Sequence, residues 1–380
     1  MESNNILDMI RNFLLGFIRT IVLIFAVICA LGLLVTAYSS YISPEFMSYV
    51  GAVGILFPVF VLLNVIVLIG GIVTWHRVTW VAVLALVLSF PALRIYCPIH
   101  FGKESHRFIN LDEGRQFSLM TYNVMGFDTN YKKKGHNAIG DYLSKSGEDI
   151  ICLQEAGYTK NKRYFTADDL RKALSDYPYY DNTARKNRLA FFSRYPIVKK
   201  WNFAEKDILP ETRCYVIVMG KTNQDTVLVI NNHMCSNKLT KENRIVFDSI
   251  SRLYRDEQSM TKLHEIPQRL TEASVTRAKQ VDLLKQKIDS LKKEYTHIIV
   301  CGDMNATPLS YLNRQLRKSL TNVYESVGNG IGTTYNKHRF YVRIDHVYVN
   351  ENITPFSVEV DRSISTSDHY PLKCVFQLHD

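Results

Sequence analysis

Residues 297–308 read HIIVCGDMNATP, and this stretch decides how the rest of the chain is interpreted. The apolar run before Gly302 is typical of a buried strand, and a glycine allows the chain to turn sharply at its end. Asp303 and Asn305 follow two positions apart, so we expect their side chains on the same side. A carboxylate and a carboxamide placed together can hold a hard cation and a phosphate oxygen. On its own the motif fits an ordinary turn equally well, so the other strand ends have to decide.

The 380 residues are enough for a membrane region followed by one substantial domain. The first hundred residues hold four Lys or Arg and three Asp or Glu, which leaves 42 basic and 33 acidic residues for the rest. Nearly all of the formal net charge of +10 therefore lies after residue 100. Basic clusters at 132–134, 160–163 and 185–188 suit a polyanion or an anionic lipid surface, and each one equally suits a solvated basic face. The seven cysteines show no metal-ligand spacing.

Three apolar runs, at 20–38, 46–75 and 78–93, precede the charged part of the chain. The first is long enough to cross a bilayer, and the third is shorter and interrupted by Pro91. A cleaved signal peptide explains the first run poorly, because two more follow it. We therefore expect an all-α membrane region of three transmembrane helices at 1–100, a linker at 101–116 and a separate domain at 117–380.

The positive residues that flank the apolar runs predict an orientation. Arg11 and Arg19 precede the first run and Arg77 lies between the second and third, whereas the link at 39–47 contains no Lys or Arg. The positive-inside rule then places the N-terminus in the cytoplasm. With three crossings, the domain after residue 101 lies outside the cytoplasm in this multi-pass protein. A re-entrant third run would instead leave the domain in the cytoplasm.

Polar side chains follow several other predicted strands of the domain. The pairs of predicted strand and polar residue are 116–121 with Asn123, 149–153 with Glu155, and the strand pair 214–219 and 226–231 with His233. A carboxylate just past a buried strand can bind a metal ion or form a salt bridge. A lone histidine is more often structural than catalytic. A turn at 221–224 is expected to join the strand pair.

Two further acids and a histidine lie near the C-terminus. Asp345 falls within a predicted strand at 340–349, where an apolar residue would be expected, so this carboxylate needs a partner. Asp368 and His369 are adjacent and precede a last strand at 373–378. Their side chains are expected to point to different sides, which would let one address a metal ion while the other faces a substrate.

Two segments have helical character. Residues 136–146 have helical spacing and precede the strand at 149–153. Residues 239–291 are highly charged, contain no glycine and include Pro267 as the only breaker. This pattern predicts two or three helices joined at 265–267. The apolar positions near the end of the segment suit packing on a sheet face.

In this order, the motifs resemble the endonuclease/exonuclease/phosphatase superfamily. The matching motifs are Tyr122-Asn123, Leu153-Gln154-Glu155, Asn231-Asn232-His233, Gly302-Asp303-Met304-Asn305, Arg343-Ile344-Asp345 and Ser367-Asp368-His369, and the pair Arg277 and Gln280 resembles a shorter element of the family. The resemblance covers roughly 117–378. One motif alone would be weak, but six in the right order make coincidence improbable.

The resemblance implies a four-layer α/β sandwich, in which two packed mixed sheets are flanked by helices. It also implies a role for each motif residue. Glu155 would be the principal Mg²⁺ ligand, with Asn123 and Asp368 nearby. Asp303 would orient or deprotonate the attacking water, Asn305 would hold a phosphate oxygen, His233 and His369 would flank the phosphate, and Asp345 would orient His369.

The resulting expectation is a membrane-anchored phosphoesterase that uses Mg²⁺, with Mn²⁺ as a substitute, to hydrolyse phosphodiester bonds. Nucleic acid ranks slightly ahead of a phospholipid headgroup as substrate. The alternatives are a phospholipid or sphingomyelin phosphodiesterase, an inositol-phosphate phosphatase, and a non-catalytic membrane-tethered binding module. The lipid bilayer is the only other partner that the sequence indicates. One departure from the family pattern is the long segment between His233 and Arg277, which predicts an unusual cover over one side of the site.

Overall fold

The structure is a computed structural model that describes residues 2–74, 77–100, 116–127, 137–157, 165–182, 188–219, 225–237, 257–337 and 341–379. Several predicted features lie outside these ranges. They are the linker 101–116 apart from its last residue, the turn at 221–224, the basic clusters 132–134 and 160–163, and all of the cluster 185–188 except Arg188.

Two six-stranded sheets form the body of the domain. The first has the order β11-β12-β1-β2-β4-β3, with β1 Gln116–Asn123, β2 Ile150–Gln154, β3 Tyr179–Asp181, β4 Ala190–Ser193, β11 Ile353–Val360 and β12 Leu372–Leu378. The second has the order β5-β6-β7-β8-β10-β9, with β5 Ile197–Asn202, β6 Thr212–Met219, β7 Asp225–His233, β8 His297–Asp303, β9 Thr321–Asn322 and β10 Asp345–Val349. Each sheet contains one parallel pair, β1 with β2 and β7 with β8, among antiparallel pairs. Both sheets are therefore mixed.

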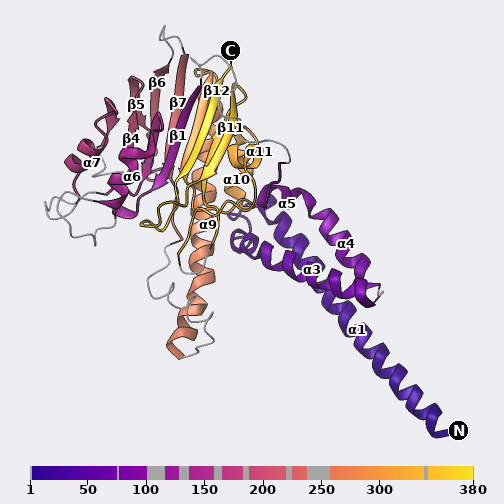
Figure 1. The fold of residues 1–380 in the computed structure, drawn as a ribbon. Coiled ribbons are helices and arrows are strands. Elements are labelled where there is room, and N and C mark those ends of the chain that lie inside the picture. The colour runs from indigo at the N-terminus through magenta and orange to yellow at the C-terminus, as the bar shows by residue number, and fades with distance from the viewer. Residues whose placement is uncertain are drawn as a thin grey trace.

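The sheets pack face to face and helices cover their outer sides (Figure 1). Buried apolar side chains from both sheets fill the space between them, and the rings of Phe191 and Tyr215 stack there with centroids 4.0 Å apart. The outer helices are α6 Ala138–Ser146 and α7 Ala167–Ala173 on the first sheet, and α9 Glu257–Leu291 and α10 Tyr311–Leu316 on the second. A short helix, α11 Val323–Val327, follows β9. The predicted four-layer α/β sandwich is confirmed.

The two parallel pairs bring polar residues to one end of the sandwich. Asn123 lies opposite Gln154 where β1 and β2 end, and His233 lies opposite Asp303 where β7 and β8 end. Parallel strands finish at the same edge of a sheet, so four polar strand ends meet where the two sheets face each other.

Gly302 does not end its strand, as the sequence had suggested, because β8 continues through Asp303. The glycine is required for a different reason. Its φ is +133°, and a Cβ atom at this position would lie 1.9 Å from the carbonyl oxygen of Asn232 on β7. Only a residue without a side chain lets β7 and β8 approach this closely, so Gly302 sets the spacing of the two strands that carry His233 and Asp303.

The predicted break at 265–267 is wrong, because α9 is one helix of 35 residues with Pro267 inside it. Proline removes one backbone hydrogen bond and usually kinks or ends a helix. Here Pro267 is exposed, in the part of α9 that lies before the sheet-covering positions Val281, Leu284 and Ile288. The packing of that second part, which has the predicted apolar spacing, holds the helix on the sheet. Residues 239–256 lie outside the described ranges.

The N-terminal hundred residues form a helical region. Its helices are α1 Glu2–Tyr38, α2 Val50–Val53, α3 Phe57–Thr74, α4 Val78–Leu88 and α5 Phe90–Tyr96. Within the described residues, two helices are long and apolar enough to cross a membrane, or up to three if α4 and α5, bent by 57°, count as one span. Small and polar residues mediate the packing of α1 on α3. The ring of Phe60 lies where Gly32 has no side chain, and the amide of Asn64 donates to the Cys29 carbonyl at 2.8 Å.

We predict that Gly302→Ala lowers the free energy of unfolding by about 3 kcal/mol or more, because the new methyl group overlaps the Asn232 carbonyl oxygen. Gly147→Ala is the matched control, because Gly147 also has a positive φ, +83°, but no atom lies within 4 Å of its Cβ position. The control should lose only about 1 kcal/mol, the cost of the backbone conformation. Denaturant unfolding of the full chain in detergent measures both values. Equal losses would show that β7 moves aside freely.

Candidate active site

The carboxylate of Asp303 is the centre of the site. Asp303 is 1% exposed, and its backbone continues β8 between β7 and β10. The amide nitrogen of Asn123, from the other sheet, donates to Oδ2 of Asp303 at 3.0 Å. The backbone N–H of Asn305 donates to Oδ1 at 2.8 Å, and its side-chain amide donates to Oδ2 at 3.2 Å. One carboxylate therefore joins the ends of both sheets.

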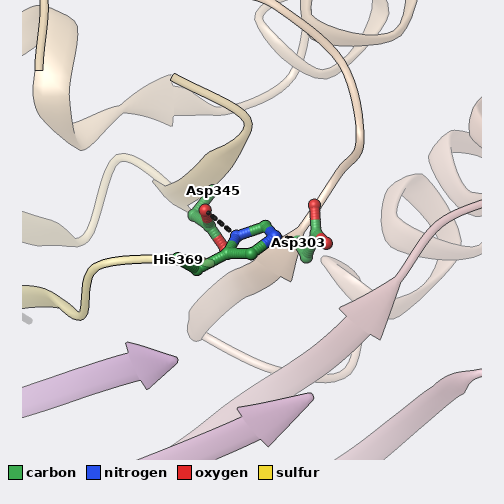
Figure 2. A group of neighbouring side chains, drawn as sticks. All are labelled: Asp303, Asp345 and His369. Carbon is green, nitrogen blue, oxygen red and sulfur yellow. Dashed lines mark hydrogen bonds and ion pairs between the residues drawn. The ribbon is translucent and has the colours of Figure 1, made fainter. Parts of the chain in front are cut away.

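His369 lies between two carboxylates (Figure 2). Its Nδ1 is 2.7 Å from Oδ2 of Asp345, and its Nε2 is 3.7 Å from Oδ2 of Asp303. Asp345 is the first residue of β10 and lies opposite Asp303 in the antiparallel register. The acid that looked misplaced in the sequence thus contacts a histidine. The ring of Tyr335 packs edge-on against His369, with the centroids 5.3 Å apart.

His233 approaches Asp303 from the other side. Its Nε2 is 3.7 Å from Oδ2 of Asp303 and 3.7 Å from Oε1 of Glu155. Its Nδ1 forms a short hydrogen bond with the carboxylate of Glu211, a residue that the sequence analysis missed. The pairing register of the β6–β7 hairpin would have identified Glu211 as the partner of His233. Thr212 pairs with Asn232, so the preceding Glu211 must lie beside His233.

Glu155 directly follows β2 and is the most accessible carboxylate of the cluster, with a side chain 25% exposed. Its Oε1 is 3.4 Å from the amide nitrogen of Asn123, and its Oε2 accepts from Arg188 at 2.8 Å. Glu155 and Asn305 both have positive φ angles, +50° and +49°, which are uncommon for residues with side chains. Such backbone strain persists where the surrounding structure enforces it and is frequent at functional sites.

Asp368 lies at the edge of the cluster rather than at its centre. Its carboxylate acts on the neighbouring His369 electrostatically, and its carbonyl oxygen accepts from the backbone of Asn336. The hydroxyl of Ser367 donates to the Asn123 carbonyl at 2.7 Å, which ties this loop to the end of β1. The structure therefore brings all eight predicted site residues to one end of the sandwich. Direct contacts join seven of them.

Both histidines favour the charged imidazolium. Burial opposes the charge on His369, but the carboxylates of Asp345 and Asp303 outweigh this effect and raise its pKa to about 10. Burial also opposes the charge on His233, and Glu211, Asp303 and Glu155 together raise its pKa. Burial raises the pKa of Asp303, while the two histidines oppose that rise. The site thus places one buried acid between two imidazoles whose pKa values the surrounding carboxylates raise.

The residues fit a hard divalent cation. Asp303, Asp345 and His369 each offer one ligand atom, and these atoms lie within 4.8 Å of one another. We do not regard this trio as the metal site, because Nδ1 of His369 is already hydrogen-bonded to Asp345 and its Nε2 lies 3.7 Å from Oδ2 of Asp303 as an ion pair. Glu155 is a better candidate for a metal ligand, because its carboxylate is partly exposed and contacts the same Asn123 amide as the carboxylate of Asp303. Oxygen donors of this kind suit Mg²⁺ and Mn²⁺. The amide nitrogen of Asn123, not its oxygen, faces these carboxylates, so Asn123 positions them here.

Arg277 and Gln280 support the loop that follows His233. Arg277 is buried on α9, and its guanidinium donates to the Cys235 carbonyl at 2.8 Å and to Oδ1 of Asn237 at 2.9 Å. Gln280, one turn later, accepts from the Cys235 backbone N–H at 2.9 Å. These two residues hold the loop in place from the outer helix layer.

We predict that Asp345→Asn changes the titration of His369 in the protein treated with EDTA. The raised pKa of His369 in the folded state means that its ion pair contributes fully to stability below about pH 6.5 and loses this contribution as the pH rises through about 10. Without the Asp345 charge, the pKa of His369 should fall toward its ordinary value. The ¹³C shifts of labelled imidazoles measure this change. His346, whose pKa burial lowers to about 3, is the internal control and should not titrate between pH 5 and 9 in either protein.

Family models match two parts of this chain. The model of the endonuclease/exonuclease/phosphatase family matches residues 120–369, and the model of a domain of unknown function matches residues 19–96. A sequence search of curated proteins gave no match. An endonuclease/exonuclease/phosphatase from Bacteroides vulgatus is similar in structure, with 17% identity, a TM-score of 0.47, and coverage of 70% of this chain and 99% of that one. TDP2 from Caenorhabditis elegans is similar with 15% identity, a TM-score of 0.47, and coverage of 83% and 93%.

The family match identifies the class of protein. Members of this family hydrolyse phosphoester bonds and depend on a divalent metal ion. The match extends over more than half of the chain and includes every residue of the site from Asn123 to His369. The chain belongs to the endonuclease/exonuclease/phosphatase family.

Proposed function

We propose that this chain is a membrane-anchored phosphodiesterase that uses a divalent metal ion, Mg²⁺ or as a substitute Mn²⁺. In this proposal residues 1–100 are the membrane region, 101–116 the linker and 117–380 the catalytic domain. The observation that carries the proposal is the pair of imidazoles around Asp303. Each imidazole is held by its own carboxylate, His369 by Asp345 and His233 by Glu211.

This arrangement suits attack on a phosphodiester. Hydrolysis places a water oxygen on phosphorus, breaks the bond to the leaving oxygen, and builds negative charge on the non-bridging oxygens. Asp303 lies where it can orient the water and take its proton. The imidazolium rings of His233 and His369 face the same space and stabilise the charge on the phosphate. Asn305, which already contacts Asp303, would donate to a phosphate oxygen.

The metal ion would be held by Glu155, with Asn123 and Asp368 close by. When bound, it supplies a Lewis acid that polarises a phosphate oxygen. Arg188 now contacts the carboxylate of Glu155, and its side chain is 47% exposed, so it is free to turn toward a substrate phosphate.

The arrangement of the helices supports the predicted orientation in the membrane. The phenol of Tyr38, at the end of α1, donates to the Leu88 carbonyl at the end of α4, and the carbonyl of Ile95 in α5 accepts from Arg343 of the catalytic domain. The segment from α3 to α5 thus begins and ends beside this domain. Figure 1 shows α3 and α4 extending away from the domain, and Arg77 is the residue that precedes α4. If α4 and α5 together make one full crossing, the domain lies on the side opposite Arg77. We propose a cytoplasmic N-terminus and a catalytic domain outside the cytoplasm.

We predict that Glu155→Gln, Asp303→Asn and His369→Asn each lower kcat for bis(4-nitrophenyl) phosphate by about 10²–10⁴. The full chain in detergent, with Mg²⁺, is the enzyme for this assay, and EDTA should abolish its turnover. Asp289→Asn is the matched control, since Asp289 is an acid on the outer helix α9 that pairs with Lys285. Near-normal turnover of any folded site variant, or full activity after exhaustive chelation, would contradict the proposal.

We also predict that a reporter fused after Asp380 is active only outside the cytoplasm. The physical reason is that Arg11, Arg19 and Arg77 hold one side of the membrane region in the cytoplasm. Paired reporters, one active on each side of the membrane, measure the orientation in living cells. A signal from the cytoplasmic reporter alone would refute the proposed topology.

A further inference from the structure

The membrane region is seated against the catalytic domain rather than only joined to it. A Cβ atom on Gly51 of α2 would lie 2.3 Å from the Cβ atom of Ser274 on α9, so the two helices touch at this point. Nearby, the guanidinium of Arg314 on α10 lies 3.7 Å from the ring centroid of Tyr41. Figure 1 shows the membrane helices meeting the domain beside α9 and α10.

Two more contacts complete this junction. Leu309, two residues before α10 begins, is buried in an apolar cluster of the membrane helices that includes Leu33 and Phe57. At the exit from α5, the carbonyl of Ile95 accepts from the buried guanidinium of Arg343 at 2.8 Å. We call the contacts of Gly51, Tyr41, Leu309 and Ile95 with the other part of the chain the dock.

The dock is continuous with the loops of the active site. Ser274 accepts from Arg277 at 3.2 Å, and Arg277 holds the Cys235 carbonyl two residues after His233. Leu309 lies four residues after Asn305. Arg343 lies two residues before Asp345. Three separate series of contacts thus connect the membrane helices with the loops that carry the catalytic residues.

The dock also lies beside exposed aromatic side chains of the membrane region. The loop between α1 and α2 exposes large aromatic side chains, with Tyr41 at 61%, Phe46 at 87% and Tyr49 at 69% exposure. Aromatic residues at the ends of membrane spans lie at the level of the lipid headgroups. Tyr41 is itself part of the dock and Tyr49 is two residues from Gly51. The path from Gly51 through one turn of α9 to His233 is no longer than about 25 Å.

We propose that the membrane region is a docked part of the active-site scaffold, which holds the site at the bilayer surface, and that the substrate is the phosphodiester headgroup of a membrane lipid. This inference rests on the proposed phosphodiesterase function. A headgroup lies within the plane that the dock fixes, so it reaches the site by lateral diffusion. A nucleic acid would instead have to bring a polyanion against a bilayer surface that repels it wherever anionic lipids are present.

The first test compares substrates on the full chain reconstituted in vesicles of phosphatidylethanolamine and phosphatidylglycerol with Mg²⁺. Equal phosphodiester concentrations of vesicle lipid, duplex DNA, single-stranded DNA, RNA and bis(4-nitrophenyl) phosphate are assayed side by side. We expect headgroup release from lipid at least tenfold faster than cleavage of any nucleic acid. Faster cleavage of DNA or RNA, or turnover of bis(4-nitrophenyl) phosphate without any of lipid, overturns this inference alone. No turnover of any phosphodiester overturns the proposed function as well.

The second test separates docking from chemistry. Gly51→Leu places a large side chain where Ser274 packs. Gly16→Leu, at a position in α1 with no atom within 4 Å, is the matched control. We expect Gly51→Leu to lower the ratio of lipid to bis(4-nitrophenyl) phosphate turnover at least fivefold, and the control to keep the ratio of the unaltered chain.

A second variant pair tests the same dock at its cation–π contact. Arg314→Ala removes the guanidinium over Tyr41, and Arg171→Ala is the control because Arg171 lies 4.3 Å from the ring centroid of Tyr180, away from the dock. We expect the ratio to fall for Arg314→Ala only. If lipid and bis(4-nitrophenyl) phosphate turnover fell equally, the dock would only support the fold. If neither activity changed in either dock variant, the dock would have no role in catalysis. Either result would overturn the inference.

Discussion

A buried carboxylate, that of Asp303, is the constraint on which the rest of the site depends. At 1% exposure it has lost nearly all contact with water, which is costly for a charged group unless partners replace the water. Asn305 supplies partners from the same loop, and Asn123 supplies one from the opposite sheet. The site therefore requires that both sheets end at the same place. This is the geometric reason why a face-to-face sandwich, with one parallel pair in each sheet, can hold it.

The charge on Asp303 also explains why the two histidines are arranged as they are. Each ring has one nitrogen 3.7 Å from Asp303 and the other nitrogen on a separate carboxylate, Asp345 or Glu211. The outer carboxylates fix the ring orientations and raise the pKa of both rings, which favours positive charge on the nitrogens that face the central space. Removal of either outer carboxylate would leave a buried ring with one fewer partner. The five groups therefore function as one electrostatic unit.

Most residues of this site could be predicted, because a sequence shows where its strands end. Asn123, Glu155 and Asp303 each lie at the end of a predicted strand. The parallel pairing of β1 with β2 brings Asn123 and Glu155 to one edge, and that of β7 with β8 brings His233 and Asp303 to the matching edge of the other sheet. Glu211 was missed because its link to His233 depends on the register of a hairpin, which the apolar pattern alone does not specify. The requirement for a glycine at position 302 could be predicted, but the predicted reason for it is wrong. The sequence indicated a turn, whereas the close approach of Asn232 is a contact between strands that no local pattern records.

The contacts between the membrane helices and the domain also join distant segments, so no local sequence pattern records them. They change the role that residues 1–100 can have. The sequence predicts a membrane region at 1–100 that a linker at 101–116 joins to the domain, and a flexible linker would leave the domain free to rotate above the bilayer. The contacts at Gly51, Leu309 and Ile95 lie far apart in the sequence and on different helices, so together they remove that rotation. For a site held at a fixed height and orientation above the bilayer, the effective concentration of substrates in one plane is higher, and that of all other substrates is lower. The catalytic residues suit both a lipid and a polymer, so the lipid proposal rests on the junction, above all on the packing of Gly51 against Ser274 in the middle of α9.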